Sequence, residues 1–189
     1  SATEAAVGRS DCIQSRLVER LTMLEVFPEL FVGDEHDYQA VVRHQDGWAV
    51  VHACKEPHHR STLGYSGRAA PKSHPEYLVA RRGERLILNL VDAPDPAYIP
   101  QEVIDAALEF VETKLRDGRR VLIHCNEGNS RAPSIAFLYL VSRTDRFAGN
   151  DLDTALAAFQ LLYPSYHPAS GVHGFIRAHY DAYCRDKIQ

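Results

Sequence analysis

Short apolar runs alternate along most of the chain with segments in which apolar residues recur at helical spacing. Ile13, Leu17 and Leu21 recur at helical spacing and predict an amphipathic helix from Asp11 to about Val26. Further apolar runs predict strands at 29–34, 48–54, 85–91 and 120–125, and apolar residues at helical spacing predict helices at 35–44, 100–118, 131–142, 151–162 and 171–184. Strands that alternate with helices are typical of a parallel sheet. The pattern therefore predicts an α/β fold, a single domain with a central, largely parallel sheet flanked by helices.

Residues 55–85 interrupt this pattern. The segment is rich in proline, glycine and basic residues, and no apolar repeat runs through it. Loops of this length are uncommon in compact domains and are often functional. The sequence predicts a long loop here, which is either a solvated surface segment or a basic flap.

Composition narrows the class of protein. The chain has 189 residues, 45% of them hydrophobic, and a formal net charge of -4, which suits a globular domain and argues against a stable nucleic-acid partner. No run approaches the roughly 20 apolar residues that cross a bilayer, so no transmembrane segment is expected, and the N-terminus does not resemble a signal peptide. The four cysteines are scattered and form neither a disulfide framework nor a zinc-finger pattern. These features favour a cytoplasmic or other reducing, intracellular location.

Two cysteines are each followed by an arginine at the same spacing. "HCNEGNSR" contains Cys125 and Arg131, and "CKEPHHR" contains Cys54 and Arg60. Cys125 ends a predicted buried strand, and the loop after it leads into a predicted helix, where α/β sheets place ligands. Residues 126–130 include a glycine and no proline, so their N–H groups can all point inward, bind an oxyanion and stabilise a thiolate. Because Arg131 adds a planar fork for two phosphate oxygens, the pattern indicates nucleophilic attack on phosphorus.

Cys54 lacks this setting. Pro57 removes a backbone donor from the following residues, no glycine lets the chain curl, and no helical repeat follows. We interpret Cys54 as a buried cysteine at a strand end whose spacing to an arginine is coincidental. The nearby His52, His58 and His59 lack a convincing fourth ligand, so we expect them in loops or at the surface and predict no metal site.

The stretch "RVLIHCNEGNSRAPS" resembles the phosphate-binding loop of the cysteine-based protein phosphatases of the dual-specificity type, which have the motif HCxxGxSR. "VFPELFVGD" and "GWAVVHAC" are similar to the family's first strands. "YPSYHPASGVHGF" resembles its closing segment, although an asparagine often found there is absent. The resemblance covers about residues 26–184. It implies an N-terminal tail and helix at 1–25 and a phosphatase catalytic domain at 26–189, in which 55–85 looks like an insertion.

The resemblance also implies a mechanism that needs neither a metal nor a cofactor. Cys125 attacks phosphorus and forms a cysteinyl-phosphate, and His124 orients the loop. The family's general acid is an aspartate on a loop after a strand. Asp92 directly follows an apolar strand and matches that position better than Asp95, which lies between two prolines as in a turn. The residues implied to hold the phosphate are Asn126, Glu127, Gly128, Asn129, Ser130 and Arg131.

Ala132 departs from the family pattern. The family usually has Ser or Thr at this position, and its hydroxyl helps the thiolate to leave in the second chemical step. The departure implies slower breakdown of the phospho-enzyme, without loss of activity. We expect the Ser130 hydroxyl to substitute in part.

The loop also bears on the substrate. It carries Glu127 and no lysine, which disfavours highly charged substrates by like-charge repulsion. We therefore expect a phosphorylated protein or peptide, with phosphotyrosine preferred and phosphoserine or phosphothreonine also accepted. The alternatives are a phosphatase of phosphoinositides, RNA 5′-phosphates or soluble polyphosphates, and a pseudophosphatase that only binds phosphopeptides. A basic 55–85 flap would recruit acidic phosphopeptides or additional phosphate groups. Because Cys125, Arg131 and Asp92 are all present, the last alternative is disfavoured; the sequence makes no prediction of oligomeric state.

Overall fold

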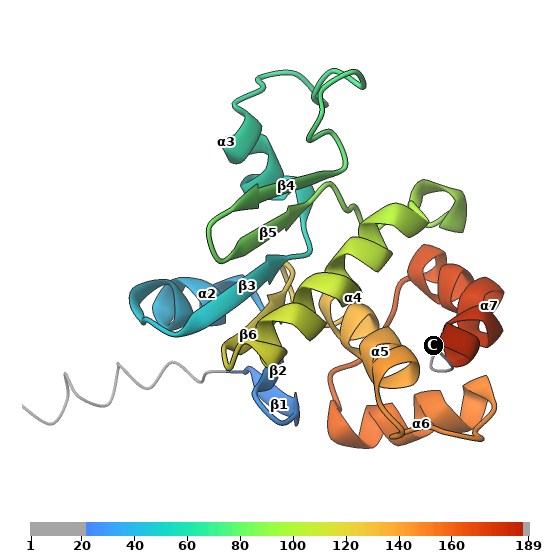
Figure 1. Cartoon of the computed structure of the whole chain (residues 1–189). Helices are drawn as coiled ribbons and strands as arrows, with labels where there is room; N and C mark the ends of the chain where they lie inside the picture. The colour runs from blue at the N-terminus through green and yellow to red at the C-terminus, as the bar shows by residue number, and fades with distance from the viewer. Residues whose placement is uncertain (1–21, 187–189) are drawn as a thin grey trace, which may run out of the picture.

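The computed structural model of the chain describes residues 22–186 (Figure 1). A six-stranded sheet with the order β1-β2-β6-β3-β5-β4 lies at its centre. The strands are β1 (Leu24–Phe27), β2 (Leu30–Gly33), β3 (Trp48–His52), β4 (Val79–Arg82), β5 (Arg85–Leu88) and β6 (Arg120–His124). The strands β2, β6, β3 and β5 pair in parallel, whereas β1 and β4 pair antiparallel at the two edges. This topology confirms the predicted α/β fold with a largely parallel sheet.

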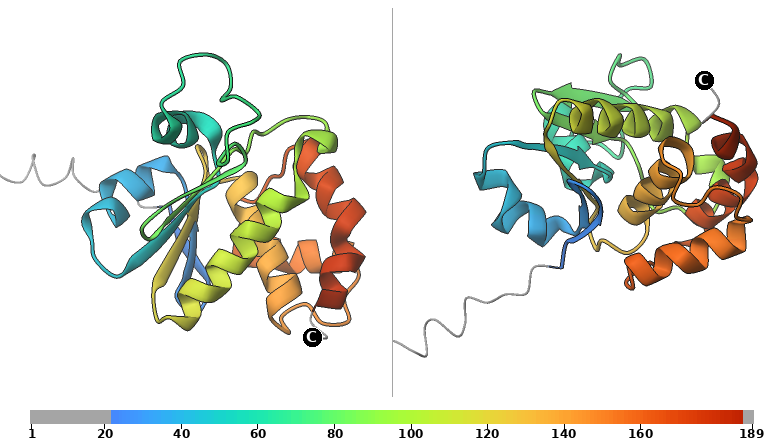
Figure 2. Two further views of the ribbon diagram at one scale, coloured as in Figure 1. Left: turned by 45° about the horizontal axis from the view of Figure 1, so that its top comes forward. Right: turned by 60° about the horizontal axis from the view of Figure 1, so that its bottom comes forward.

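Helices cover both faces of the sheet. They are α2 (Glu35–Ala40), η1 (Val42–His44), η2 (Lys55–His59), α3 (Arg60–Leu63), η3 (Pro96–Tyr98), α4 (Gln101–Arg116), α5 (Arg131–Arg143), α6 (Leu152–Leu162) and α7 (Ser170–Arg185). Figure 2 shows α4, α5 and α7 on one side of the sheet and α2 on the other. The helices predicted at 35–44 and after residue 100 are thus confirmed. Within residues 22–186, no helix combines the length and the hydropathy required to cross a bilayer.

Local signals set the ends of two of these helices. Asp34 caps α2, because its carboxylate accepts the Asp37 N–H at 2.8 Å while the Asp37 carboxylate accepts the Asp34 N–H at 3.0 Å. The helix α4 ends before Gly118, whose φ of 76° is the left-handed conformation expected just after a helix. The sequence predicted this second end correctly.

The predicted helix from Asp11 to Val26 is wrong at its C-terminal end. Leu24–Phe27 form β1, in which Leu24 pairs with Val32 of β2, so the boundary expected after residue 25 falls inside a strand. Residues 11–21 lie outside the described part of the chain. Pairing with β2 gives β1 its hydrogen bonds and buries Val26, and the helical spacing of the leucines carries no information about that partner.

The prediction of a loop without secondary structure at 55–85 is also wrong. The segment begins with η2 and α3, and it ends with β4, which forms a hairpin with β5. Strand β4 escaped prediction because Ala80 is its one fully buried residue and Arg81 and Arg82 are exposed. An edge strand of this kind has no apolar alternation, so only its pairing with β5 reveals it.

Strands β3 and β6 send alternate side chains to opposite faces of the sheet. One face belongs to the larger hydrophobic core, which also contains α4 and α5, and receives Ala49, Val51, Val121 and Ile123. The other face belongs to a smaller cluster on the α2 side, made of Trp48, Val50 and Leu122 together with Tyr38 and Val42. His52 and His124 lie on this second face and contact the Tyr38 ring. The register pairs His52 with His124, so two histidines lie side by side where the central strands end.

Candidate active site

Cys125 lies at the carboxyl end of the parallel strands, as the sequence predicts. It directly follows β6, and only 1% of its surface is exposed. Residues 126–130 then form a loop that leads into α5 at Arg131. Strand ends and the N-terminus of the next helix together make a site where backbone dipoles favour an anion.

Donors outside this loop hold its carbonyl oxygens. The bonds run from Glu35 N to Asn126 O (3.4 Å), from Tyr163 Oη to Gly128 O (2.6 Å) and from His167 N to Asn129 O (2.7 Å). In a planar trans peptide the C=O and the next N–H point in opposite directions. The N–H groups of Glu127, Asn129 and Ser130 are therefore directed away from these donors. This orientation is compatible with the inward-facing donors predicted from the loop sequence, which stays a prediction.

Gly128 is required by the path of the loop. Its φ is 71°, in the left-handed region that favours glycine. A Cβ at this position would also lie 2.9 Å from Gly33 O, closer than such atoms approach. The glycine of the motif thus lets the loop curl against the end of β2.

Arg131 is anchored by two of its three nitrogens. Its Nη1 donates to Leu90 O at 3.1 Å, and its Nη2 donates to Asn126 Oδ1 at 2.7 Å. Its Nε is buried and has no hydrogen-bond partner among the described residues. A buried donor without a partner is costly, so Arg131 Nε is a candidate for binding a substrate oxygen.

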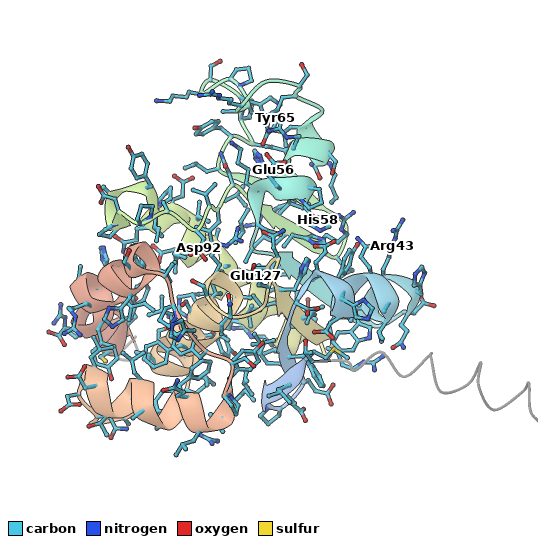
Figure 3. The ribbon with its side chains drawn as sticks, turned by 180° about the vertical axis from the view of Figure 1, so that it is seen from behind. Arg43, Glu56, His58, Tyr65, Asp92 and Glu127 are labelled. Carbon is cyan, nitrogen blue, oxygen red and sulfur yellow. The ribbon has the colours of Figure 1, made fainter. Side chains whose placement is uncertain are left out.

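Asp92 is connected to the loop through Ser130. The Ser130 hydroxyl donates to Asp92 Oδ1 at 3.0 Å and accepts the Ala169 N–H at 2.9 Å. The Asp92 side chain is exposed, and Figure 3 shows it on the same side of the molecule as Glu127. Asp95 instead caps η3 by accepting the Ala97 N–H at 2.9 Å, as expected of a turn residue. Of the two candidate acids, Asp92 is therefore the one linked to the loop.

The closing segment holds the Asp92 loop and the 126–130 loop together. Ser170 Oγ donates to Pro94 O at 2.9 Å, and a Cβ on Gly171 would lie only 2.0 Å from Ala93 O. The start of α7 therefore packs directly on the residues after Asp92. Sequence reasoning recognised this segment but assigned no role to its residues, since their partners lie far away along the chain. The tyrosine, serine and glycine residues of "YPSYHPASG" are the sequence features that could have indicated this role.

A hydrogen-bonded pair of buried histidines lies beneath the loop. His124 Nε2 and His52 Nδ1 are 2.6 Å apart, and Arg85 Nε donates to His52 Nε2 at 2.9 Å. Burial lowers the pKa of His52, and nearby cationic groups lower it further. Burial also lowers the pKa of His124 to about 4, in spite of the Glu35 carboxylate nearby. His124 is therefore neutral at physiological pH and suited to orienting the loop.

The expectation that the histidines of this region lie in loops or at the surface is wrong. His52 and His59 are fully buried, and His58 is nearly so. His58 Nε2 lies 2.8 Å from Glu35 Oε2, because η2 folds back over the end of β3 toward α2. Burial raises the pKa of Glu35, but the bonds from His58 and Gln39 lower it overall, so Glu35 is a carboxylate. The sequence around His58 gave no sign of this partner from another helix.

Cys54 follows β3 as Cys125 follows β6, but its setting differs. Burial raises the pKa of the Cys54 thiol to about 12, although Arg131 nearby lowers it. Cys54 is therefore a neutral thiol, which agrees with its interpretation as a buried cysteine. A short helix, α3, does follow it, contrary to expectation, yet Arg60 forms an ion pair with Glu56 at 2.7 Å. This second Cys–Arg spacing therefore does not build an anion site.

Several basic residues of the 55–85 segment are already engaged. Besides Arg60, Arg82 forms an ion pair with Glu76 at 2.7 Å, and Arg85 donates to His52. Figure 3 shows Glu56 and Tyr65 of this segment above Glu127. Asn126 Nδ2 donates to Glu56 O at 2.9 Å. The segment thus touches the 126–130 loop, and local carboxylates offset part of the positive charge of the segment.

Comparisons with known proteins identify the fold. No protein-family model and no curated protein matches the sequence. Among solved structures, human DUSP28 aligns with a TM-score of 0.55 at 19% identity, over 86% of this chain and 95% of its own. The human tyrosine phosphatase-like serine/threonine/tyrosine-interacting protein aligns with 0.56 at 18% identity, over 87% and 99%. DUSP15 aligns with 0.58 at 16% identity, over 87% and 92%. The chain therefore has the fold of the dual-specificity phosphatases.

Proposed function

We propose that this protein hydrolyses phosphomonoesters of proteins through a cysteinyl-phosphate at Cys125, without a metal in the chemical step. The observation that carries the proposal is the unpaired, buried Nε of Arg131. Arg131 begins α5 directly after the 126–130 loop, whose carbonyl oxygens bond to donors outside the loop and whose N–H groups are left to surround a phosphate. Cys54, Cys125 and Cys184 are free cysteines, and a thiolate nucleophile suits a reducing, cytoplasmic location.

In the first step the Cys125 thiolate attacks phosphorus and the bond from phosphorus to the leaving oxygen breaks. In the transition state the negative charge is spread over the three equatorial phosphate oxygens, and the loop N–H groups and Arg131 stabilise it. Asp92 gives its proton to the leaving oxygen. The bond from Ser130 to Asp92 holds the acid beside the loop that binds the phosphate.

In the second step a water molecule attacks phosphorus and the S–P bond breaks. The Asp92 carboxylate accepts a proton from that water, which regenerates the acid and releases inorganic phosphate. The departing thiolate returns to the same N–H groups that stabilised it before the reaction. Both steps therefore use one set of donors and one carboxyl group.

The Asp92→Asn variant tests the acid. We expect kcat toward an alkyl phosphate to fall by about 10²–10³-fold, because the amide cannot donate a proton to the leaving oxygen. The pH profile of kcat should lose the limb that requires a protonated acid. Steady-state rates measured across pH for this variant and for Asp95→Asn check this, since Asp95 only caps η3. A loss confined to Asp95→Asn would reject Asp92 as the acid.

The Ala132→Ser variant tests the second step. Ser130 was expected to help the thiolate to leave, but its proton is donated to Asp92, which leaves Ala132 without a substitute. We expect the wild type to show a burst of the first product followed by a slow steady state. A serine hydroxyl near the thiolate should raise the steady-state rate about tenfold, the value of one hydrogen bond to a charged group. Stopped-flow measurement of both proteins checks this, and equal steady-state rates would contradict it.

The preferred substrate is a phosphorylated protein or peptide, and phosphotyrosine is preferred over phosphoserine and phosphothreonine. The exposed Glu127 on the loop disfavours substrates with several phosphates, whereas the exposed Arg68, Lys72 and Arg81 of the 55–85 segment favour them. A panel of phosphotyrosine, phosphoserine and phosphothreonine peptides, phosphoinositides, RNA 5′-phosphates and inorganic polyphosphate decides between these classes. We expect the highest kcat/KM on phosphotyrosine peptides.

Other outcomes of the panel would change the assignment. Higher kcat/KM on a lipid, RNA or polyphosphate would assign the enzyme to that class. Binding of phosphopeptides without turnover of any substrate would instead indicate a pseudophosphatase. The Cys125→Ser variant, which lacks the proposed nucleophile, is the negative control for every substrate.

A further inference from the structure

Four side chains with metal-binding atoms meet beneath the phosphate-binding loop. Glu35 comes from α2, Cys54 from the residues after β3, His58 from η2 and His124 from the end of β6. Their ligand atoms all lie within 4.8 Å of one another, and three of the four residues are buried. The fold thus supplies the additional ligands that the sequence around His58 lacks.

The rings in this cluster are held by packing. His58 stacks on His52 with ring centroids 4.0 Å apart, and Tyr38 stacks on His124 at 5.0 Å. The Glu35 carboxylate lies between the two candidate imidazole ligands, 2.8 Å from His58 Nε2 and 3.5 Å from His124 Nδ1. Ligands ordered in advance lose little conformational entropy when an ion binds.

We propose that Glu35, Cys54, His58 and His124 bind a divalent transition-metal ion, with zinc as the best match. One thiolate, one carboxylate and two imidazoles are ligands that tetrahedral zinc accepts, whereas Mg²⁺ and Ca²⁺ prefer sites built from oxygen alone. The thiolate and the carboxylate together balance the charge of the ion. A neutral unit of this kind can be buried, as three of these four residues are.

The spacing of the ligands is close to that of a bound ion. Zinc bond lengths of about 2.0–2.3 Å place tetrahedral ligand atoms roughly 3.3–3.6 Å apart. The ligand atoms here are at most 4.8 Å apart, so side-chain movements of about an ångström complete the site. Binding releases the Cys54 thiol proton to solvent, since the thiolate is the form that coordinates.

The hydrogen bonds of His52 determine which ring nitrogen of His124 carries the proton. Arg85 Nε can only donate, so the His52 proton is on Nδ1 and is donated to His124 Nε2. His124 then carries its own proton on Nδ1, the nitrogen that faces Glu35. An ion at this nitrogen requires the His124 proton to move to Nε2, where it is donated to His52 Nδ1. The His52 proton must then move from Nδ1 to Nε2, where it would face the Arg85 N–H, so Arg85 has to turn away. Arg85 therefore opposes metal binding, and its removal should favour it.

An ion at this site has a structural role. It joins Cys54, which follows β3, and His58 of the 55–85 segment to α2 and to His124, the residue before the nucleophile. An ion that binds only the folded chain stabilises it by mass action, without taking part in the chemistry at Cys125. The inference is thus independent of the proposed phosphatase activity.

The test is a titration of the metal-free protein, residues 1–189, with Co²⁺, which reports its own coordination by absorption. Tetrahedral Co²⁺ gives intense visible ligand-field bands, and a thiolate ligand adds a charge-transfer band in the near ultraviolet. We expect both to saturate at one ion per chain, and we expect Zn²⁺ to displace the Co²⁺ and to raise Tm. Elemental analysis of the protein as purified should find zinc.

Variants identify the ligands. Cys54→Ser should abolish the charge-transfer band, and His58→Gln should weaken Co²⁺ binding by at least about tenfold. Arg85→Met should tighten it by about tenfold. Cys125→Ser and Cys184→Ser are the matched controls and should keep the band unchanged. Circular dichroism of each metal-free variant verifies that it is folded.

Three results would overturn the proposal. The first is the absence of tetrahedral bands in the folded wild type, which does not depend on any variant. The second is a charge-transfer band lost in Cys125→Ser and kept in Cys54→Ser, which would mean that the ion binds the nucleophile. Unchanged affinity in His58→Gln would likewise reject the site.

Discussion

Replacing Cys125 by serine is expected to reduce turnover by at least about 10⁴-fold, as the loss of a catalytic nucleophile typically does. A serine hydroxyl is not ionised at neutral pH, so the loop N–H groups would surround a poor nucleophile. The change removes little volume from a site that is 1% exposed, so the fold should persist. Hydrolysis of a phosphotyrosine peptide measures the loss, and calorimetry measures peptide binding, which should remain.

A control and a direct observation complete this experiment. Cys184→Ser changes a half-buried cysteine of α7 and should leave kcat unaltered. Rapid acid quenching of the wild type during turnover should trap one phosphate on the peptide that contains Cys125, detected by mass spectrometry. A Cys125→Ser variant that turns over substrate at the wild-type rate would exclude the proposed intermediate.

Replacing Arg131 by lysine is expected to lower kcat/KM by about 10²–10³-fold, although the positive charge is kept. The guanidinium donates at the same time to Leu90 O and Asn126 Oδ1 and still has its Nε for the substrate. A single ammonium group cannot reproduce this planar arrangement. Steady-state kinetics on a phosphotyrosine peptide measure the effect, which should appear in both kcat and KM.

The chain offers a matched control for Arg131. Arg60 stands at the same spacing from Cys54 but pairs with Glu56. Arg60→Lys should therefore leave kcat/KM within about twofold of the wild type, as is usual for exposed ion pairs. Equal losses in the two lysine variants would indicate a general effect of charge geometry and would count against a direct role for Arg131.

The sequence was sufficient wherever a segment carries its own signal. The buried runs that become β3 and β6, the periodic helices after residue 100 and the C-terminal end of α4 at Gly118 were all predicted. The elements that failed depend on partners elsewhere. Strand β1 needs β2, and the mostly polar β4 needs β5, because edge strands are defined by pairing rather than by their own apolar pattern.

Some features of the candidate active site are likewise predictable from local sequence, whereas others depend on tertiary contacts. The sequence by itself determined the loop from Cys125 to Arg131, because the glycine, the absence of proline, the preceding strand and the following helix are all local properties. Only the tertiary structure decided that Ser130 binds Asp92, that Arg131 keeps one buried donor unpaired and that His58 meets Glu35. These contacts join residues that are far apart along the chain. Their geometry is set by how the sheet, α2 and α7 pack together, which no local pattern of residues records.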